Sequence, residues 1–550
     1  MTTSTTSNAP TKITNGNDFT GTLTLLRFML RRDRIRLPSW ALGLTLFMAY
    51  CVAGIDGVLE TDEDLESLAT FAHTPIGALL GGPGIGFDNL TLERFLMGQY
   101  GLYILIGASV LGILTIVRHT RVEERTGRAE LVRANVLGRH AHLTAALLMA
   151  AITSVLAAGL IAALFIGNGF DSHSSLLFAT GIAACAMAFA GIASITVQLS
   201  EFPRAASGIG SALLGAAFIL RGLGDMAAIQ GNGLSWLSWL SPIGWSQQTG
   251  PFVYDRWWPL ALTLAFAAAT TTVGYVLSSR RDLDAGLLPP RLGSPVAAAW
   301  LNSTPALAFR LQRANLLGWT SGLFLAGLVF GFFAQPMLDG LDDAPEDLVA
   351  MFGADGGILD GYLGMMSMLT AFIVAAYAIL AVQSLRSEET DGRTEPVLAT
   401  AVSRHRWLGS NLGVAAVGAL WLLLVMGVGL GIGTASSTGD SSLFGDMMVA
   451  PLAQLPAVLL VLSLAALLYG WYPPGLPLLW LVIGYGYVVG FFAPILDIPD
   501  SMVDVSPFEH IGWYPQEEVS WPAFTLLFSI AVVVLIAALA TFRRRDLITK

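Results

Sequence analysis

Twelve long stretches of this chain are apolar and contain no Asp, Glu, Lys or Arg. Each is close to the roughly 20 residues that an α-helix needs to cross the hydrocarbon core of a bilayer. Only 12% of all residues are charged, about half the share usual in soluble domains. The sequence therefore predicts an all-α polytopic membrane protein whose fifth span is short. The predicted spans are 38–55, 97–117, 143–166, 175–199, 207–220, 259–278, 314–334, 361–384, 409–432, 449–470, 476–496 and 522–542.

Charged residues are sorted between the two faces of these spans. One face carries 26 of the 29 basic residues, and the opposite face carries 26 of the 39 acidic residues. Because basic loops stay on the cytoplasmic side, both termini are predicted to be cytoplasmic. Residues 1–19 are polar and lack the apolar region of a signal peptide, so we expect a disordered cytoplasmic tail. The net charge of −10 argues against a nucleic-acid partner; membrane lipid is the expected surrounding.

The chain repeats itself at an offset of about 265 residues. The loop after the second span, 121–140, and the loop after the eighth, 386–405, are identical at ten of twenty positions. The motif Arg280-Arg281-Asp282-Leu283 recurs as Arg544-Arg545-Asp546-Leu547. Repeats of this kind indicate two halves with the same topology. The predicted organisation is a six-helix half at 20–284, a cytoplasmic linker at 285–308 and a second six-helix half at 309–550.

Each repeated loop has the pattern E-E-x-x-G-R-x-E. We expect a short helix after the glycine, at 129–138 in the first half, to present charged side chains to a partner in the cytoplasm. The alternative is that these charges only anchor an interfacial loop. The matching of both signs across the repeat favours a partner.

Tryptophans recur on the predicted outer side. Residues 234–245 place aromatic side chains at helical spacing before the sixth span, and 506–521 is the counterpart in the second half. One interpretation is an aromatic belt at the membrane interface. The other is an outer gate, whose candidate residues are Trp236, Trp239, Trp245 and Trp513.

No enzyme active site is predicted. The histidines form no metal set, no catalytic Ser/His/Asp arrangement can be located, and the glycine-rich run 81–89 follows no strand. The glycines at 427–433 are expected to permit close helix packing. A Walker A loop needs a lysine, and the two lysines, Lys12 and Lys550, lie at the chain ends. The energy for any transport must therefore come from a separate ATPase or from an ion gradient.

These motifs resemble the fused, twelve-span type-2 permeases of ATP-binding-cassette exporters, in particular the actinobacterial antibiotic and multidrug exporter permeases. The resemblance implies a location in a bacterial plasma membrane and a partner ATPase in two copies that binds ATP and Mg²⁺, with no cofactor in this chain. It also implies that the helix after the second span of each half is a coupling helix. The coupling residues would be Glu123, Glu124, Gly127, Arg128 and Glu130, and Glu388, Glu389, Gly392, Arg393 and Glu395.

The predicted function is the export of hydrophobic or amphipathic compounds, such as an antibiotic, drug or lipid. A proton-coupled secondary transporter of the major-facilitator kind is the alternative. The long repeated loops and the lack of an ionisable residue within the predicted spans disfavour it. A polytopic enzyme, for example a lipid-linked sugar transferase, is disfavoured by the direct repeat.

Overall fold

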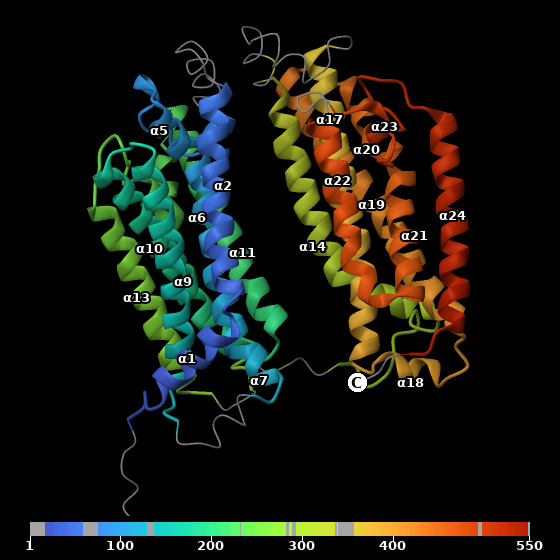
Figure 1. The fold of residues 1–550 in the computed structure, drawn as a ribbon, viewed down its shortest axis with the longest axis horizontal. Helices are drawn as coiled ribbons and strands as arrows, with labels where there is room; N and C mark the ends of the chain where they lie inside the picture. The colour runs from blue at the N-terminus through green and yellow to red at the C-terminus, as the bar shows by residue number, and fades with distance from the viewer. Residues whose placement is uncertain are drawn as a thin grey trace, which may run out of the picture. The chain divides into compact units, whose positions relative to one another are not determined.

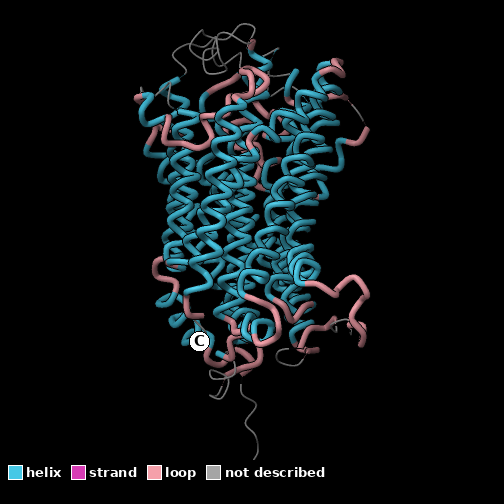
Figure 2. Tube along the Cα trace, turned by 90° about the vertical axis from the view of Figure 1, so that its right-hand side faces the viewer, coloured by secondary structure: helices cyan, strands magenta, loops and turns pink. Residues whose placement is uncertain are grey.

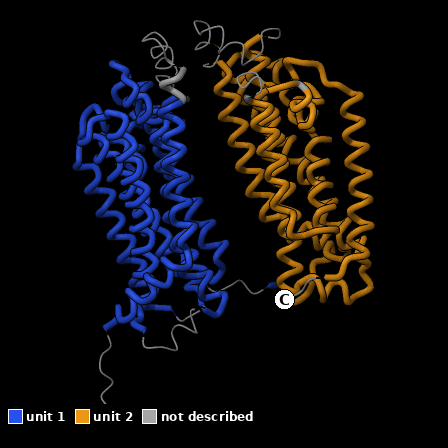
Figure 3. The backbone as a smooth tube through the Cα atoms, viewed as in Figure 1, with its two compact units in different colours: residues 1–293 blue, residues 294–550 orange. Residues whose placement is uncertain are grey.

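In a computed structural model of the chain, two compact units divide at Gly293 and Ser294 (Figure 3), within the stretch predicted as the linker. The structure describes residues 17–58, 75–128, 137–231, 233–281, 285–288, 293–335, 338, 357–492 and 498–547. Within these ranges twelve helices are long and apolar enough to span a membrane, and no strand is present. The prediction of an all-α polytopic membrane protein is therefore confirmed. The predicted tail lies outside the described residues up to residue 16, whereas Asn17–Phe19 form an ordered turn.

Unit 1 is built around α10, which packs against α6, α9, α11 and α13 (Figure 1). Asp171 caps this central helix, because its side chain accepts a hydrogen bond of 2.8 Å from the Ser174 amide. The elements of unit 1 are α1 Thr22–Arg32, α2 Arg36–Val58, α4 Pro75–Leu80, η1 Phe87–Asn89, α5 Leu92–Phe95, η2 Leu96–Tyr100, α6 Gly101–Val117, η3 Arg118–Val122, α7 Glu123–Arg125, α9 Ala141–Gly167, α10 Ser172–Leu199, α11 Pro203–Ile229, η4 Ser235–Leu240, α12 Pro242–Gln247 and α13 Trp258–Ser278.

Unit 2 has its largest buried cluster along α17, α19 and α21, and the loops of both units join helix ends (Figure 2). Ser303 and Ser403 are the N-caps of α14 and α19, because their side chains accept hydrogen bonds from the Ala306 and Arg406 amides. The elements of unit 2 are α14 Thr304–Phe332, α17 Ile358–Thr390, α18 Thr394–Leu398, α19 Arg404–Thr438, α20 Leu443–Ala453, α21 Leu455–Trp471, η5 Pro473–Leu478, α22 Leu479–Phe492, α23 Asp500–Val503 and α24 Trp521–Arg544.

The same packing pairs occur in both units. The first span packs on the third, as α2 on α9 and as α14 on α19, and the last span packs on the fourth, as α13 on α10 and as α24 on α21. A direct repeat predicts such matching pairs. In unit 2 glycines bring the first pair close together: a Cβ at Gly327 would lie 2.7 Å from the Met426 carbonyl oxygen, and one at Gly433 would lie 2.5 Å from that of Leu328. The glycines of α19 therefore serve helix packing, as expected.

The fifth span differs from the prediction. Helix α11 continues without a break from Pro203 to Ile229 and includes Arg221 and Asp225, which are 0% and 1% exposed. Arg221 donates to Asp225 at 3.2 Å and to the carbonyl oxygens of Ala78 and Leu79. Because these hydrogen bonds and the ion pair compensate for the burial of the Arg221 charge, the charge can lie inside an apolar helix. The expectation that the spans contain no ionisable residue is wrong, and it no longer counts against proton coupling.

Candidate functional site

Glu124, in the repeated loop of unit 1, is buried in a cluster of hydrogen-bonded ion pairs. Arg121 donates to its carboxylate at 2.8 Å, and Arg281 donates to both carboxylate oxygens, at 2.6 and 3.1 Å. Arg281 belongs to the repeated R-R-D-L motif directly after α13. The loop after the second span is thus tied to the end of the sixth span.

The same link occurs in unit 2. Glu389 is 2% exposed, and its carboxylate accepts hydrogen bonds of 2.6 Å from Arg545 and from the Tyr469 hydroxyl. The Arg545 guanidinium also lies over the Tyr469 ring, 5.0 Å from its centroid. We call these two clusters the loop–helix clasps: Glu124, Arg121 and Arg281 in unit 1, and Glu389, Tyr469 and Arg545 in unit 2.

A second contact strengthens each clasp. Arg139 donates to the Ser279 carbonyl oxygen just beyond α13, and the equivalent Arg404 donates to the Arg545 carbonyl oxygen at 2.5 Å. Arginine is suited to this position because it satisfies helix-end carbonyl groups that have no partner within the helix. Two of the identical loop positions, Glu124/Glu389 and Arg139/Arg404, are therefore explained by contacts within each unit.

The remaining coupling candidates divide into a structural and an exposed set. Gly127 and Gly392 adopt φ of +71° and +73°, a left-handed conformation that favours glycine and ends the helical turn that carries the two glutamates. Arg128, Arg393 and Glu395 are exposed. In unit 2 the short helix α18 follows Gly392, but 129–136, including Glu130, lie outside the described residues.

Glu123 and Glu388, the first glutamates of the two motifs, have different surroundings. Glu123 is buried and pairs with Arg32 of α1, whereas Glu388 pairs with Arg393 at 2.5 Å on the surface. Glu123, Glu124 and Glu389 are thus buried within their own units, and their assignment as coupling residues stays a prediction. The sequence showed the arginines of the R-R-D-L motif but no role for them, because residues 157 and 156 positions apart share no periodicity.

Asp33, between α1 and α2, joins the unit 1 loop to the start of the first span. Its carboxylate accepts hydrogen bonds from Arg118 at 2.8 and 3.1 Å and lies 3.0 Å from His119 Nε2. Burial alone would raise the pKa of Asp33, but the hydrogen bond from Arg118 and the neighbouring positive charges outweigh it. The pKa of Asp33 is therefore below its ordinary value.

The outer tryptophans of unit 1 form a compact group, with one exception. Trp245 donates its indole N–H to the Trp239 carbonyl oxygen at 2.6 Å, and the Trp239 ring stacks on Trp258 with centroids 5.3 Å apart. Trp236 is 54% exposed. These positions are compatible with either a belt or a gate.

In unit 2, Trp513 lies in a loop beside a carboxylate. Its indole N–H donates to Glu509 at 3.2 Å, and its backbone N–H donates to Glu517 at 3.2 Å. Burial raises the pKa of Glu509 to about 7, the Trp513 hydrogen bond opposes this, and the charge of Glu517 adds to it. The carboxyl group of Glu509 therefore titrates near neutral pH.

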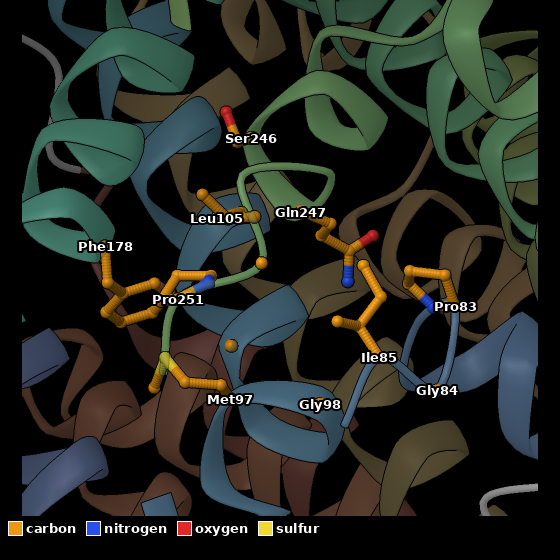
Figure 4. A pocket seen from close by; sticks show the side chains of 12 residues that line it. Pro83, Gly84, Ile85, Met97, Gly98, Leu105, Phe178, Ser246, Gln247 and Pro251 are labelled. Carbon is orange, nitrogen blue, oxygen red and sulfur yellow. The ribbon is translucent and has the colours of Figure 1, made fainter. Parts of the chain in front are cut away.

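The glycine-rich run 81–89 covers a small cavity in unit 1. The cavity, of about 40 Å³, is lined by residues of this run, of η2 and α6, and by Gln247, whose side-chain amide donates to the Gly81 carbonyl oxygen at 2.9 Å (Figure 4). A space of this size holds only one or a few waters. Gly84 and Gly86 have φ of +64° and +86°, so the glycines are explained by the turns of the run.

The described residues contain twelve helices that are long and apolar enough to cross a membrane. Together with the two comparisons that follow, they define a multi-pass membrane protein of a permease family. The chain belongs to the family described as "Multidrug efflux system permease Rv1217c, C-terminal domain", which matches residues 24–277 and 301–543. It is 37% identical over 544 residues to the multidrug efflux system permease protein Rv1217c of Mycobacterium tuberculosis (strain ATCC 25618 / H37Rv). The alignment covers 96% of each chain. The class is thus a transporter component rather than a catalytic enzyme.

Proposed function

We propose that this chain is the membrane-spanning permease of an ATP-binding-cassette exporter that moves hydrophobic or amphipathic compounds out of the cell. The name of the 37% identical relative supports efflux of drugs. The resemblance of the repeated loops to coupling helices supports a separate ATPase, in two copies, that binds ATP and Mg²⁺. Both termini would lie in the cytoplasm, as the positive-inside rule predicts.

The duplicated loop–helix clasp is the observation that carries this proposal. A coupling loop must transmit force, and a loop joined by buried ion pairs to the sixth span of its unit can move that span. The exposed residues of the same loop, Arg128, Arg393 and Glu395, would then contact the ATPase. In this proposal the buried residues of the loop transmit motion to the sixth span, and the exposed residues bind the ATPase.

The test compares energy sources in inverted membrane vesicles that contain the full chain and its efflux-system partners. We expect uptake of a fluorescent amphipathic drug to require hydrolysable ATP and to persist when a protonophore collapses the proton gradient. Uptake without ATP that stops with the protonophore would instead favour the secondary transporter. Arg221 and Asp225 would then be the first residues to examine.

A double charge reversal, Arg393→Glu with Glu395→Arg, tests the docking role. Both side chains are exposed and Arg393 forms only surface ion pairs, so stability should fall by no more than about 1 kcal/mol while ATP-driven uptake falls at least tenfold. Glu518→Lys, at an exposed site in the outer loop of the same unit, is the matched control and should keep normal uptake. Normal uptake in the double variant would contradict a docking role for this loop.

A further inference from the structure

Unit 2 contains an open apolar groove between α14 and α19. Its volume is about 780 Å³, within the roughly 300–1,000 Å³ typical of ligand sites. Phe309, Leu317, Val417 and Trp421 line it, and each is more than a third exposed. The groove is hollow because glycines stand where side chains would fill it. A Cβ at Gly413 would meet nothing within 4 Å.

The end of this groove nearest the start of α14 is expected to lie at the level of the lipid headgroups. Helix α14 has 29 residues, which gives a length of about 43 Å, whereas the hydrocarbon core is only about 30 Å thick. The first turns of α14 therefore project beyond the core, on the side predicted to be cytoplasmic. Arg313, which lines the groove, lies at this boundary.

Arg313 lines the groove, and two further arginines, Arg310 and Arg406, lie in the first turns of α14 and α19. Arg310, Arg313 and Arg406 are exposed, and none forms an ion pair with any residue in the ranges that the structure describes. Elsewhere in the same unit Arg393 and Arg545 are paired with acids. An apolar groove lined by one unpaired guanidinium group, that of Arg313, is complementary to an acyl chain that ends in an anionic headgroup.

We propose that the α14–α19 groove binds one anionic phospholipid of the inner leaflet. The acyl chain lies along Leu317, Val417 and Trp421, and the phosphate contacts Arg313. This proposal rests on the predicted orientation of α14 but not on the energy source for transport. A lipid in this position would fill the space that the glycines of α19 leave open.

The experiment uses the full chain purified in detergent and measures bound lipid by native mass spectrometry after addition of phosphatidylglycerol or phosphatidylcholine. The unaltered protein should retain one phosphatidylglycerol in preference to phosphatidylcholine. Arg313→Gln should reduce that preference roughly fivefold, the effect of about one basic residue at a membrane surface. Gly413→Leu should abolish retention of either lipid, because a Cβ at this position meets no other atom within 4 Å and the added side chain takes up space in the groove that Gly413 lines.

Gly318→Leu is the matched control. Gly318 also faces open space, on α14, but does not line the groove, so its lipid binding should be unchanged. Equal lipid binding by Gly413→Leu and the unaltered protein would overturn the proposal. Displacement of the lipid by an exported drug at similar concentration would also overturn it, because the groove would then be a drug site.

Discussion

Glu124 in unit 1 lies between two guanidinium groups, whereas Glu389 in unit 2 lies between one guanidinium group and one phenol. The glutamate and the arginine from the end of the sixth span are the same in both units, and only the third partner differs. The invariant feature is thus the link between the loop and the last helix. The third partner sets how strongly each unit depends on the carboxylate.

The largest expected effect is the loss of stability on reversing the buried charge. Leaving a buried ion pair without one partner costs about 3–5 kcal/mol. Glu124→Lys would face two arginines, so it should reach the upper end of this range, and Glu389→Lys should reach the lower end. The measurement is thermal unfolding of the purified protein, followed by tryptophan fluorescence.

The conservative variants Glu124→Gln and Glu389→Gln serve as controls and should lose less, because the amide still accepts hydrogen bonds. If Glu389→Lys were the more damaging reversal, the number of guanidinium groups would not be what distinguishes the two clasps.

The surroundings of the outer tryptophans should differ in how their contribution to stability depends on pH, because Trp513 donates a hydrogen bond to the titrating carboxyl group of Glu509. Between about pH 4.5 and 7 folded Glu509 keeps a proton that the unfolded chain has released, so stability falls as pH rises through this window. Glu509→Gln should therefore raise the stability of the protein by about 2 kcal/mol at pH 8 and leave it unchanged at pH 4.

Trp245→Phe provides the comparison in unit 1, because Trp245 donates to a neutral carbonyl group. It should cost about 1 kcal/mol at every pH. Thermal unfolding at pH 4, 6 and 8 distinguishes the two variants, and a pH-independent gain in Glu509→Gln would show that the carboxyl group does not titrate as described.

The residues at the start of the first span in each unit should also differ in how their effect on stability depends on pH. The segments 37–44 and 316–323 share the pattern L-x-x-W-x-x-G-L. When the two segments are aligned on this pattern, Asp33 corresponds to Gln312. Because the pKa of Asp33 is lowered in the folded protein, its stabilising effect is present above about pH 4 and is lost as pH falls below it. Asp33→Asn should lower the unfolding temperature more at pH 7 than at pH 3.

Gln312→Ala is the matched variant in unit 2. Gln312 contacts Asn411 through uncharged atoms at 3.4 Å, so its effect should be the same at both pH values. A pH-independent effect of Asp33→Asn would mean that the charge of Asp33 does not stabilise unit 1.

The smallest expected effect is on the loop surface. Arg393 pairs with Glu388 and Asp391 and is 47% exposed, and such pairs contribute about 0–1 kcal/mol. Arg128 forms no ion pair with the residues that the structure describes. Arg393→Ala should lower stability by about 0.5 kcal/mol and Arg128→Ala by less, while both reduce drug efflux. Unchanged efflux in both would remove these arginines from the docking surface.

The hydrophobic pattern predicted the spans well, because a bilayer imposes both length and lack of charge on a helix. It failed at α11, where Arg221 and Asp225 neutralise each other one helical turn apart and also contact the Ala78 and Leu79 carbonyl groups. A hydropathy pattern read residue by residue excludes charge from a span. The structure instead gives the buried charge hydrogen-bond partners, which come from Asp225 on the same helix and from α4.

The sequence by itself determined the membrane class, the twelve helices and the two repeated loops, since these depend on composition and on matching segments. Only the tertiary structure decided what the repeated residues do. Glu124 and Arg281 are 157 positions apart, and no local periodicity connects them. Their pairing depends on α13 packing against α10, which brings the end of the sixth span to the loop after the second.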